Sequence, residues 1–473
     1  MPVLISHRLV IFVVLALLIH PAVTHGAGLA SAEKGSLTAA GLTGERVSDS
    51  VLGGSLVWYR GGDRDNPAVV LIHGVGDNGV RDFASIVPEL VGDYHVLAMD
   101  LPGFGASDRG NRLYEPDAYV ALLHELISTH AQDPVRLVGH SMGGALALRY
   151  AAEYPQRVDR VLVTSVPAIL HPTVYLGFLV HLGVDAEIAV GDRAETPAAE
   201  GSVRAFASRV ARRVARYTPE TSALSSRKMR KIMLGGEPAR IAGLALARTD
   251  YSATLDQISA PVALLWGERD EVAPVRTGRL LASRLPPRDL TVLDNVGHVP
   301  MTEAPEAFSD WVKSRLTAPL DAATWEAPPE VPGDAIVRCQ NEPNYRLTGR
   351  WKRIELDGCR HAVLDRVAAT HINVRNSTVR LVDPRVRGDA VGIFASGSQI
   401  VVTGGEVTAD VAVALRGGHL DAAGARLVGR SAALRAEQGG RAAEASFSVS
   451  QLVSGQHERH AHEIMALQPG ETR

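Results

Sequence analysis

The segment VRLVGHSMGGAL at residues 135–146 is the most informative part of this 473-residue sequence. Its first four residues predict a buried strand, and the apolar residues after Gly144 predict a helix. A serine between a strand and a helix, with glycine two positions away on each side, is the pattern of a nucleophile elbow. A side chain at Gly139 or Gly143 would collide with the neighbouring strand or helix. The sharp turn therefore pushes the Ser141 hydroxyl out of the backbone, at the N-terminus of the new helix.

A serine hydroxyl is a poor nucleophile, so the chain should also supply a base and a carboxylate that orients the base. His298 follows the predicted strand at 290–294. An acidic cluster follows the predicted strand at 262–266 and consists of Glu268, Asp270 and Glu271. Open α/β sheets gather their chemistry at the carboxyl ends of parallel strands. We therefore expect Ser141, His298 and one of these acids to meet there.

An oxyanion hole is predicted beside the serine. The apolar strand at 68–72 runs into His73-Gly74-Val75-Gly76. The backbone amides of Val75 and Met142 are the groups expected to face a negative oxygen that develops during the reaction.

The segment from about Ser55 to Leu316 resembles the α/β-hydrolase superfamily along its whole length. Five motifs occur in the order of that superfamily: His73-Gly74, the run DLPGFGAS at 100–107, the elbow, G-x-x-D-x-x-x-P at 267–274, and G-H-x-P-x-x-E-x-P at 297–305. The resemblance implies that Ser141 is the nucleophile, Asp270 the acid and His298 the base. It also implies that Val75 and Met142 supply the oxyanion amides. His73 and His140 flank the site and are interpreted as structural residues.

The expected function is that of a serine hydrolase that cleaves a small, apolar, ester-like substrate through an acyl-enzyme, with no cofactor and no metal. Serine at the elbow, where the haloalkane-dehalogenase and epoxide-hydrolase branches use aspartate, argues against those two chemistries. One alternative is a carbon–carbon bond hydrolase of the meta-cleavage type, which shares the Ser-Met-Gly-Gly elbow. Another is a non-catalytic ligand-binding or sensor protein on the hydrolase fold.

Composition fits a large folded enzyme of more than one domain. Hydrophobic residues make up 46% of the chain and charged residues 21%, which is typical of globular proteins. The formal net charge of −3 gives no support to a nucleic-acid partner.

The N-terminus predicts export. Residues 9–19 form an uninterrupted apolar stretch after a basic start, and small residues follow at 26–32. Such a stretch is too short for a spanning helix of about 20 residues but suits the apolar region of a signal peptide. We interpret residues 1–32 as a signal peptide and expect a periplasmic or extracellular protein. An uncleaved signal anchor is the alternative.

The chain divides into six predicted segments. They are the signal peptide at 1–32, an α/β-hydrolase core at 33–167 and 250–318, a helical cap at 168–249, a linker at 319–334, a β-solenoid-like domain at 335–455 and a tail at 456–473. One cap helix carries a basic face with Arg204, Arg209 and Arg213. We interpret that face as the solvated side of a cap helix, with membrane contact as the alternative.

Residues 335–455 consist of short β-branched runs broken by glycine and aspartate, and they repeat at an offset of 20–21. The alignment pairs Val379 with Ile400, Leu381 with Val402, Val386 with Val407, Phe394 with Leu415, and Ile400 with Leu420. A period of this length predicts a parallel β-solenoid, with a small antiparallel β-sandwich as the alternative.

The two cysteines of the chain, Cys339 and Cys359, are also one period apart. They are candidates for a single disulfide on adjacent coils, or for two free buried thiols. The expected role of this domain is recognition, such as contact with the cell envelope or a glycan.

Overall fold

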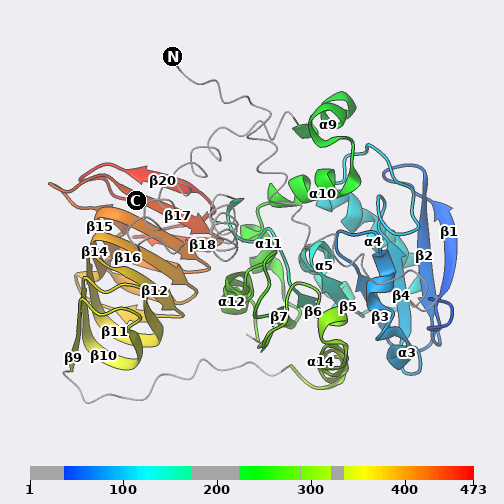
Figure 1. The fold of residues 1–473 in the computed structure, drawn as a ribbon, viewed down its shortest axis with the longest axis horizontal. Helices are drawn as coiled ribbons and strands as arrows, with labels where there is room; N and C mark the ends of the chain where they lie inside the picture. The colour runs from blue at the N-terminus through cyan, green and yellow to red at the C-terminus, as the bar shows by residue number, and fades with distance from the viewer. Residues whose placement is uncertain (1–36, 173, 175–222, 288, 321–334) are drawn as a thin grey trace, which may run out of the picture.

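The computed structural model describes residues 37–172, 174, 223–287, 289–320 and 335–473. Within these ranges the chain forms an α/β unit and, beside it, a stack of strands (Figure 1). The signal peptide, the basic helix face of the cap and most of the linker lie outside the described residues.

The α/β unit is built on an eight-stranded sheet with the order β1-β2-β4-β3-β5-β6-β7-β8. The strands are β1 (Thr43–Ser48), β2 (Ser55–Gly61), β3 (Ala68–Ile72), β4 (His95–Asp100), β5 (Val135–His140), β6 (Val158–Thr164), β7 (Val262–Gly267) and β8 (Asp289–Leu293). From β4 to β8 every neighbouring pair is parallel, whereas β1 and β2 are antiparallel additions at one edge. The predicted α/β-hydrolase sheet is confirmed. The edge strand β1 was not predicted, because its polar, exposed residues carry no apolar alternation.

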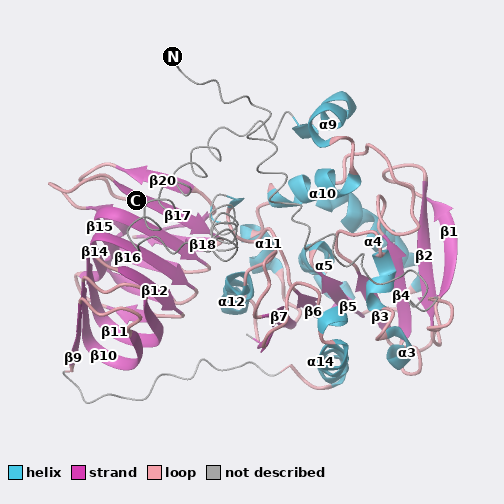
Figure 2. Cartoon of the chain, in the orientation of Figure 1, coloured by secondary structure: helices cyan, strands magenta, loops and turns pink. Residues whose placement is uncertain are grey.

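Helices cover both faces of this sheet (Figure 2). They include α3 (Val87–Leu90), α4 (Pro116–His130), α5 (Met142–Glu153), α9 (Arg227–Leu234), α10 (Pro238–Ala247), α11 (Ser252–Gln257), α12 (Val275–Arg284), α13 (Pro300–Glu303) and α14 (Pro305–Thr317). Proline stands at the first helical position of α4, α10 and α14, where its missing N–H costs nothing. Of the predicted cap, α9 and α10 lie in the described part and are helical as expected.

The alternation along β3 shows how the sheet separates two cores. Val70 and Ile72 belong to the apolar cluster of α4, α5 and the described cap helices. Val69 and Leu71 point to the opposite face of the sheet. There they belong to a second apolar cluster, which also contains Phe308 of α14. Because the central strands β3, β4, β5 and β7 are buried on both faces, they appear in the sequence as continuous apolar runs.

The C-terminal unit is all-β and its successive coils pair in parallel. Its strands are β9 (Ile336–Gln340), β10 (Arg346–Asp357), β11 (Ala362–Arg375), β12 (Thr378–Val382), β13 (Arg385–Arg387), β14 (Val391–Thr403), β15 (Glu406–Ala423), β16 (Arg426–Ala436), β17 (Ala443–Ser448) and β18 (Ser450–Ser454). Val379 lies beside Ile400, and Ile400 beside Leu420. The offsets of 21 and 20 residues are those predicted, and the parallel pairing excludes the antiparallel sandwich.

Two details of this unit differ from the prediction. Phe394 pairs with Ala414 and not with Leu415, because that part of the ladder advances by 20 residues. The predicted tail at 456–473 forms β19 (His457–Ala461) and β20 (Ile464–Leu467), which run antiparallel to β18 and β17. Strand β19 was not predicted because its residues are polar. It is a strand because its backbone pairs with β18.

A disulfide joins Cys339 and Cys359 on adjacent coils. Both residues are buried among apolar side chains of the stack. The structure therefore favours the bonded form over two free thiols.

Helix α12 joins the two units. Arg276 donates to both carboxylate oxygens of Asp421, at 2.6 and 3.0 Å, and to Thr403 Oγ1 at 3.0 Å. At the other end of the helix Arg284 donates to the carbonyl of Val449 at 2.7 Å. Val449 and Ala423 belong to the same buried apolar cluster as the sheet and its helices. The units therefore share a core as well as polar contacts.

Two histidines lie at a second point of this interface. The backbone amide of His171 donates to Ser448 Oγ at 2.9 Å, and the rings of His171 and His462 are 5.1 Å apart. Burial, reinforced by His462, lowers the pKa of His171 to about 4. Burial also lowers the pKa of His462, against the effect of Asp250.

Asp421→Ala should destabilise the protein, because it leaves the partly buried Arg276 guanidinium without its carboxylate. We expect the free energy of unfolding to fall by about 2–4 kcal/mol. Denaturant titration followed by circular dichroism measures this loss. Asp310→Ala removes an exposed carboxylate of α14 and should change stability by less than about 0.5 kcal/mol. Equal effects of the two substitutions would contradict a stabilising interface.

The interface should also weaken in acid. Folded His171 takes up its proton near pH 4, whereas an unfolded histidine does so near pH 6.5, so the unfolded state binds more protons between these values. The stability is therefore present above about pH 6.5 and is lost as the pH falls toward 4. His171→Gln should flatten the dependence of Tm on pH across this range, and His457→Gln, at an exposed position, should not. If Tm depended on pH equally steeply in His171→Gln and in the parent, His171 would not be the source of the acid sensitivity.

Candidate active site

Ser141 occupies the turn between β5 and α5 in a conformation that side chains rarely adopt, with φ 52° and ψ −123°. A Cβ atom on Gly143 would lie 2.0 Å from the carbonyl oxygen of Ile72, and one on Gly139 would lie 2.6 Å from that of Gly143. Only glycine fits at either position, because the opposing atoms belong to the backbone. The close approach of β3, β5 and α5 thus produces the elbow that the sequence predicts.

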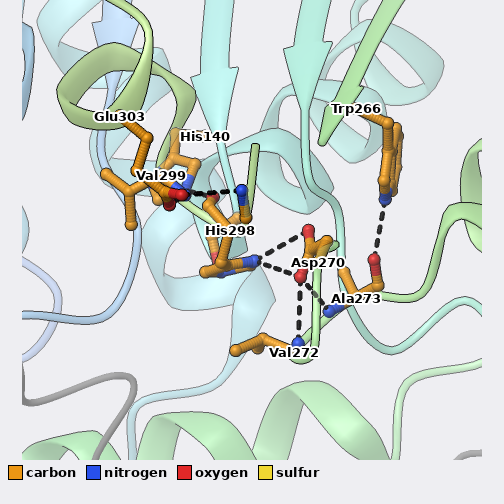
Figure 3. A network of polar contacts seen from close by, with 10 residues as sticks. His140, Trp266, Asp270, Val272, Ala273, His298, Val299 and Glu303 are labelled. Atoms are coloured by element: carbon orange, nitrogen blue, oxygen red, sulfur yellow. Dashed lines mark hydrogen bonds and ion pairs between the residues drawn. The ribbon is translucent and has the colours of Figure 1, made fainter. Parts of the chain in front are cut away.

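The structure brings Ser141, His298 and Asp270 together. His298 Nε2 lies 3.0 Å from Ser141 Oγ, and His298 Nδ1 lies 2.9 and 3.0 Å from the two Asp270 oxygens. Figure 3 shows the imidazole directed at the Asp270 carboxylate. With an N–H on Nδ1, the Nε2 atom is left as the acceptor for the serine proton.

The Asp270 carboxylate is fixed by its own loop. Its Oδ1 atom accepts hydrogen bonds from the amides of Val272 and Ala273, at 2.9 and 2.7 Å. The other acids of the cluster are exposed, and Glu268 accepts from the amide of Asn295. Of the three candidate acids, the structure therefore places Asp270 against His298.

Two further side chains hold the loops of the site, and sequence reasoning assigned them no role. Glu303 accepts hydrogen bonds from the amides of Gly297 and Val299, at 2.7 and 3.0 Å, on either side of His298 (Figure 3). Trp266 donates through Nε1 to the carbonyl of Ala273 at 2.7 Å, beside Asp270. The glutamate of the 297–305 motif was the only available signal for the first of these contacts.

The two flanking histidines bind backbone groups. His140 Nε2 lies 2.9 Å from the carbonyl oxygen of His298, and burial, together with His298, lowers the pKa of His140 to about 4. At neutral pH a neutral His140 ring therefore donates one hydrogen bond to the loop of His298. His73 accepts from the amide of Leu101 through Nε2 at 2.9 Å. These contacts are those of structural residues.

The two predicted oxyanion residues flank the serine. Val75 follows Gly74, whose backbone packs so closely that a Cβ on it would lie 2.8 Å from Ser141 Cβ. Met142 is the first residue of α5, where the helix dipole presents positive charge. The loop after β3 and the start of α5 are thus adjacent at Ser141.

Comparisons with known proteins point to hydrolases of one fold family. The family model described as "alpha/beta hydrolase fold" matches residues 67–305. An uncharacterized protein of Mycobacterium tuberculosis is 28% identical over 261 residues, which is 52% of this chain and 74% of that protein. A pimeloyl-[acyl-carrier protein] methyl ester esterase of Neisseria meningitidis is 29% identical over 250 residues, which is 51% of this chain and 89% of that protein. Among solved structures, one described as a putative lipase from Acinetobacter baumannii is 21% identical, with a TM-score of 0.42, and covers 59% of this chain and 91% of its own.

The matched region contains the elbow, the acid loop, the histidine loop and both oxyanion positions, in the order of the family. The chain belongs to the α/β-hydrolase fold family, and it is a hydrolase.

Proposed function

We propose that this protein is an exported serine hydrolase that cleaves small carboxylic esters. One observation carries the proposal: the continuous chain of hydrogen bonds from Ser141 Oγ through His298 to Asp270. Such a chain activates a hydroxyl that is otherwise unreactive at neutral pH. The name of the meningococcal relative, a methyl ester esterase, supports an ester as substrate.

The proposed reaction begins when His298 Nε2 removes the proton of Ser141. The serine oxygen attacks the ester carbonyl, and the carbonyl oxygen becomes negatively charged. Asp270 holds the imidazole in the productive tautomer and stabilises the imidazolium. His298 then protonates the leaving alcohol, and a water molecule repeats the sequence to release the acid.

We assign the oxyanion hole to the amides of Val75 and Met142. The dipole of α5 adds to their effect, because Met142 begins the helix. Each such donor contributes about 2.7–4 kcal/mol to stabilisation of the transition state in comparable sites.

An apolar acyl group suits the surroundings of the serine. Met142 packs in the same apolar cluster as Ile241 and Leu244 of α10, and Val75 is partly buried against that cluster. The described part of the cap and the oxyanion positions thus belong to one continuous apolar cluster. A small apolar substrate is therefore part of the proposal.

Export is supported by the apolar segment at 9–19 and by the disulfide, because disulfides persist in oxidising compartments. We assign the protein to the periplasm or the extracellular space. The C-terminal unit is proposed to contact the envelope or a glycan. Membrane contact through the basic residues Arg204, Arg209 and Arg213 is a further part of the proposal. Among the described helices, none is both long and apolar enough to cross a membrane.

Ser141→Ala should abolish catalysis without unfolding the protein, because the hydroxyl supports no core contact. Turnover of short p-nitrophenyl esters should fall by several orders of magnitude. A fluorophosphonate probe should label the parent and the control Ser314→Ala, whose hydroxyl only binds within α14, but not Ser141→Ala. Labelling that persists in Ser141→Ala would remove this serine from the mechanism.

The same assay separates the alternatives. Turnover of a dienoate with a scissile carbon–carbon bond, at the expense of esters, would indicate a meta-cleavage hydrolase. Ligand binding without turnover of either substrate would indicate a sensor protein.

Asp270→Asn should lower kcat by about 10⁴, because an amide favours the wrong tautomer of His298. Glu268→Gln and Glu271→Gln are matched controls in the same loop and should keep near-parental kcat. Steady-state kinetics on one ester, with circular dichroism to check folding, compares the three variants. A mild effect of Asp270→Asn beside a severe effect of either control would reassign the acid.

A further inference from the structure

One column of outward-facing residues on the C-terminal stack is rich in arginine. The parallel register places Arg346 beside Val363, Val363 beside Arg380, Arg380 beside Val401, and Val401 beside Asp421. Their neighbours along the strands, such as Leu364 and Leu381, are buried. Since side chains alternate across a strand, the column points outward. Arg346 and Arg380 are two strands apart in this column, which corresponds to about 9.6 Å at the usual strand spacing.

The column faces helix α12. Asp421, at one end of the column, forms the bidentate contact with Arg276 of that helix. Arg279 is one turn further along α12, at a spacing that shares a helix face with Arg276. Figure 1 shows α12 on the side of the α/β unit that meets the stack. Guanidinium groups from both units therefore lie at the same interface.

These groups differ in whether they have a partner. Arg276 is paired with Asp421. The side chains of Arg279, Arg346 and Arg380 are exposed, and in the described part of the chain none of them forms a hydrogen bond or an ion pair. Solvent reaches the Arg380 side chain, but partial burial of its guanidinium lowers its pKa, and so do the charges of Arg276, Arg279 and Arg346. Arg380 therefore lies close enough to the other three guanidinium groups for their charges to act on it.

Such an arrangement is unfavourable by itself. Like charges that lie close together repel, and salt weakens the repulsion. The whole chain has a net charge of −3, so this positive charge is a local concentration. A bound anion would convert the repulsion into attraction.

We propose that Arg279, Arg346 and Arg380 form a binding site for a phosphate group, either inorganic phosphate or a phosphomonoester. The planar guanidinium fork matches the oxygens of phosphate, and each pair forms two parallel hydrogen bonds. Val363 is the small side chain between the two column arginines, so an ion held by both would lie above it. Arg279 approaches from α12 and completes a site on three sides.

The geometry favours a compact anion over a membrane surface. The three arginines come from two facing elements, a helix and a strand column, and not from one exposed face. A flat lipid surface needs basic residues spread over one exposed face. The site contains none of the residues assigned to ester hydrolysis. The phosphate-site proposal can therefore be tested independently of the proposed function.

The test uses the full-length protein and titrates inorganic phosphate and phenyl phosphate by calorimetry, at ionic strength held constant with sodium chloride. Arg380→Gln and Arg346→Gln should each weaken binding about tenfold or more, because each removes a charged hydrogen-bonding partner. Arg338→Gln is the matched control. It removes an exposed arginine of the same unit that pairs with Glu355, away from the column, and should bind as the parent does.

Thermal unfolding gives a second readout with opposite signs. Without phosphate, Arg380→Gln should raise Tm, because it removes a repelling charge. With phosphate, the parent should gain several degrees and Arg380→Gln should gain little. A merely structural arginine would lower Tm in both buffers, and this result would overturn the proposal.

Three other outcomes would also overturn it. One is phosphate binding that is unchanged in both column variants. Another is stabilisation of the parent by chloride to the same extent as by phosphate, which indicates screening alone. The third is binding to phosphatidylglycerol vesicles that depends on Arg346 and Arg380 while neither phosphate compound binds, which indicates a membrane contact.

Discussion

The close approach of β3, β5 and α5 is the constraint on which the rest of the site depends. It forces Ser141 into a positive φ and leaves no room for a side chain at Gly139 or Gly143. Strain of this kind costs about 1–3 kcal/mol and persists only where the surroundings impose it. Here the surroundings are a doubly covered parallel sheet, whose core stabilises the turn. In return the hydroxyl meets His298 at the carboxyl edge of the sheet.

The acid and the base depend on a second layer of contacts. Trp266 and Glu303 each hold the backbone beside a reacting residue, and α12 begins directly after the loop of Asp270. Because α12 is bound through Arg276 to the stack of strands, the C-terminal unit packs against the helix that follows the acid loop. Ala423 and Val449 of the C-terminal unit belong to the same apolar cluster as the α/β sheet and its helices. The two units are therefore packed against each other and are not joined by the linker alone.

The sequence predicted what local chemistry determines and missed what distant contacts determine. The elbow, the acid loop and the histidine loop are recognisable because glycine and proline spacing reflects backbone geometry. The period of the stack was readable from residues such as Val379 and Ile400, since inward positions must be apolar in every coil. In contrast, β1 and β19 are polar and exposed, and only their backbone pairing makes them strands. The arginine column was hidden because its members are separated by 34 residues along the chain and meet only through the register.

The two ends of the stack have a consequence for how the protein behaves at high concentration. A parallel stack presents an open strand edge at each end, and an open edge is a template on which another chain can add a strand. Here one edge is β9, with Arg338 exposed on it, and the other is β19, whose exposed run reads His-Glu-Arg-His. Charged side chains on these two strands disfavour docking of a second copy, whereas the third outer strand, β20, is apolar and in the described part of the chain pairs only with β17. The charged edges thus work against growth of the stack by end-to-end addition of a second copy.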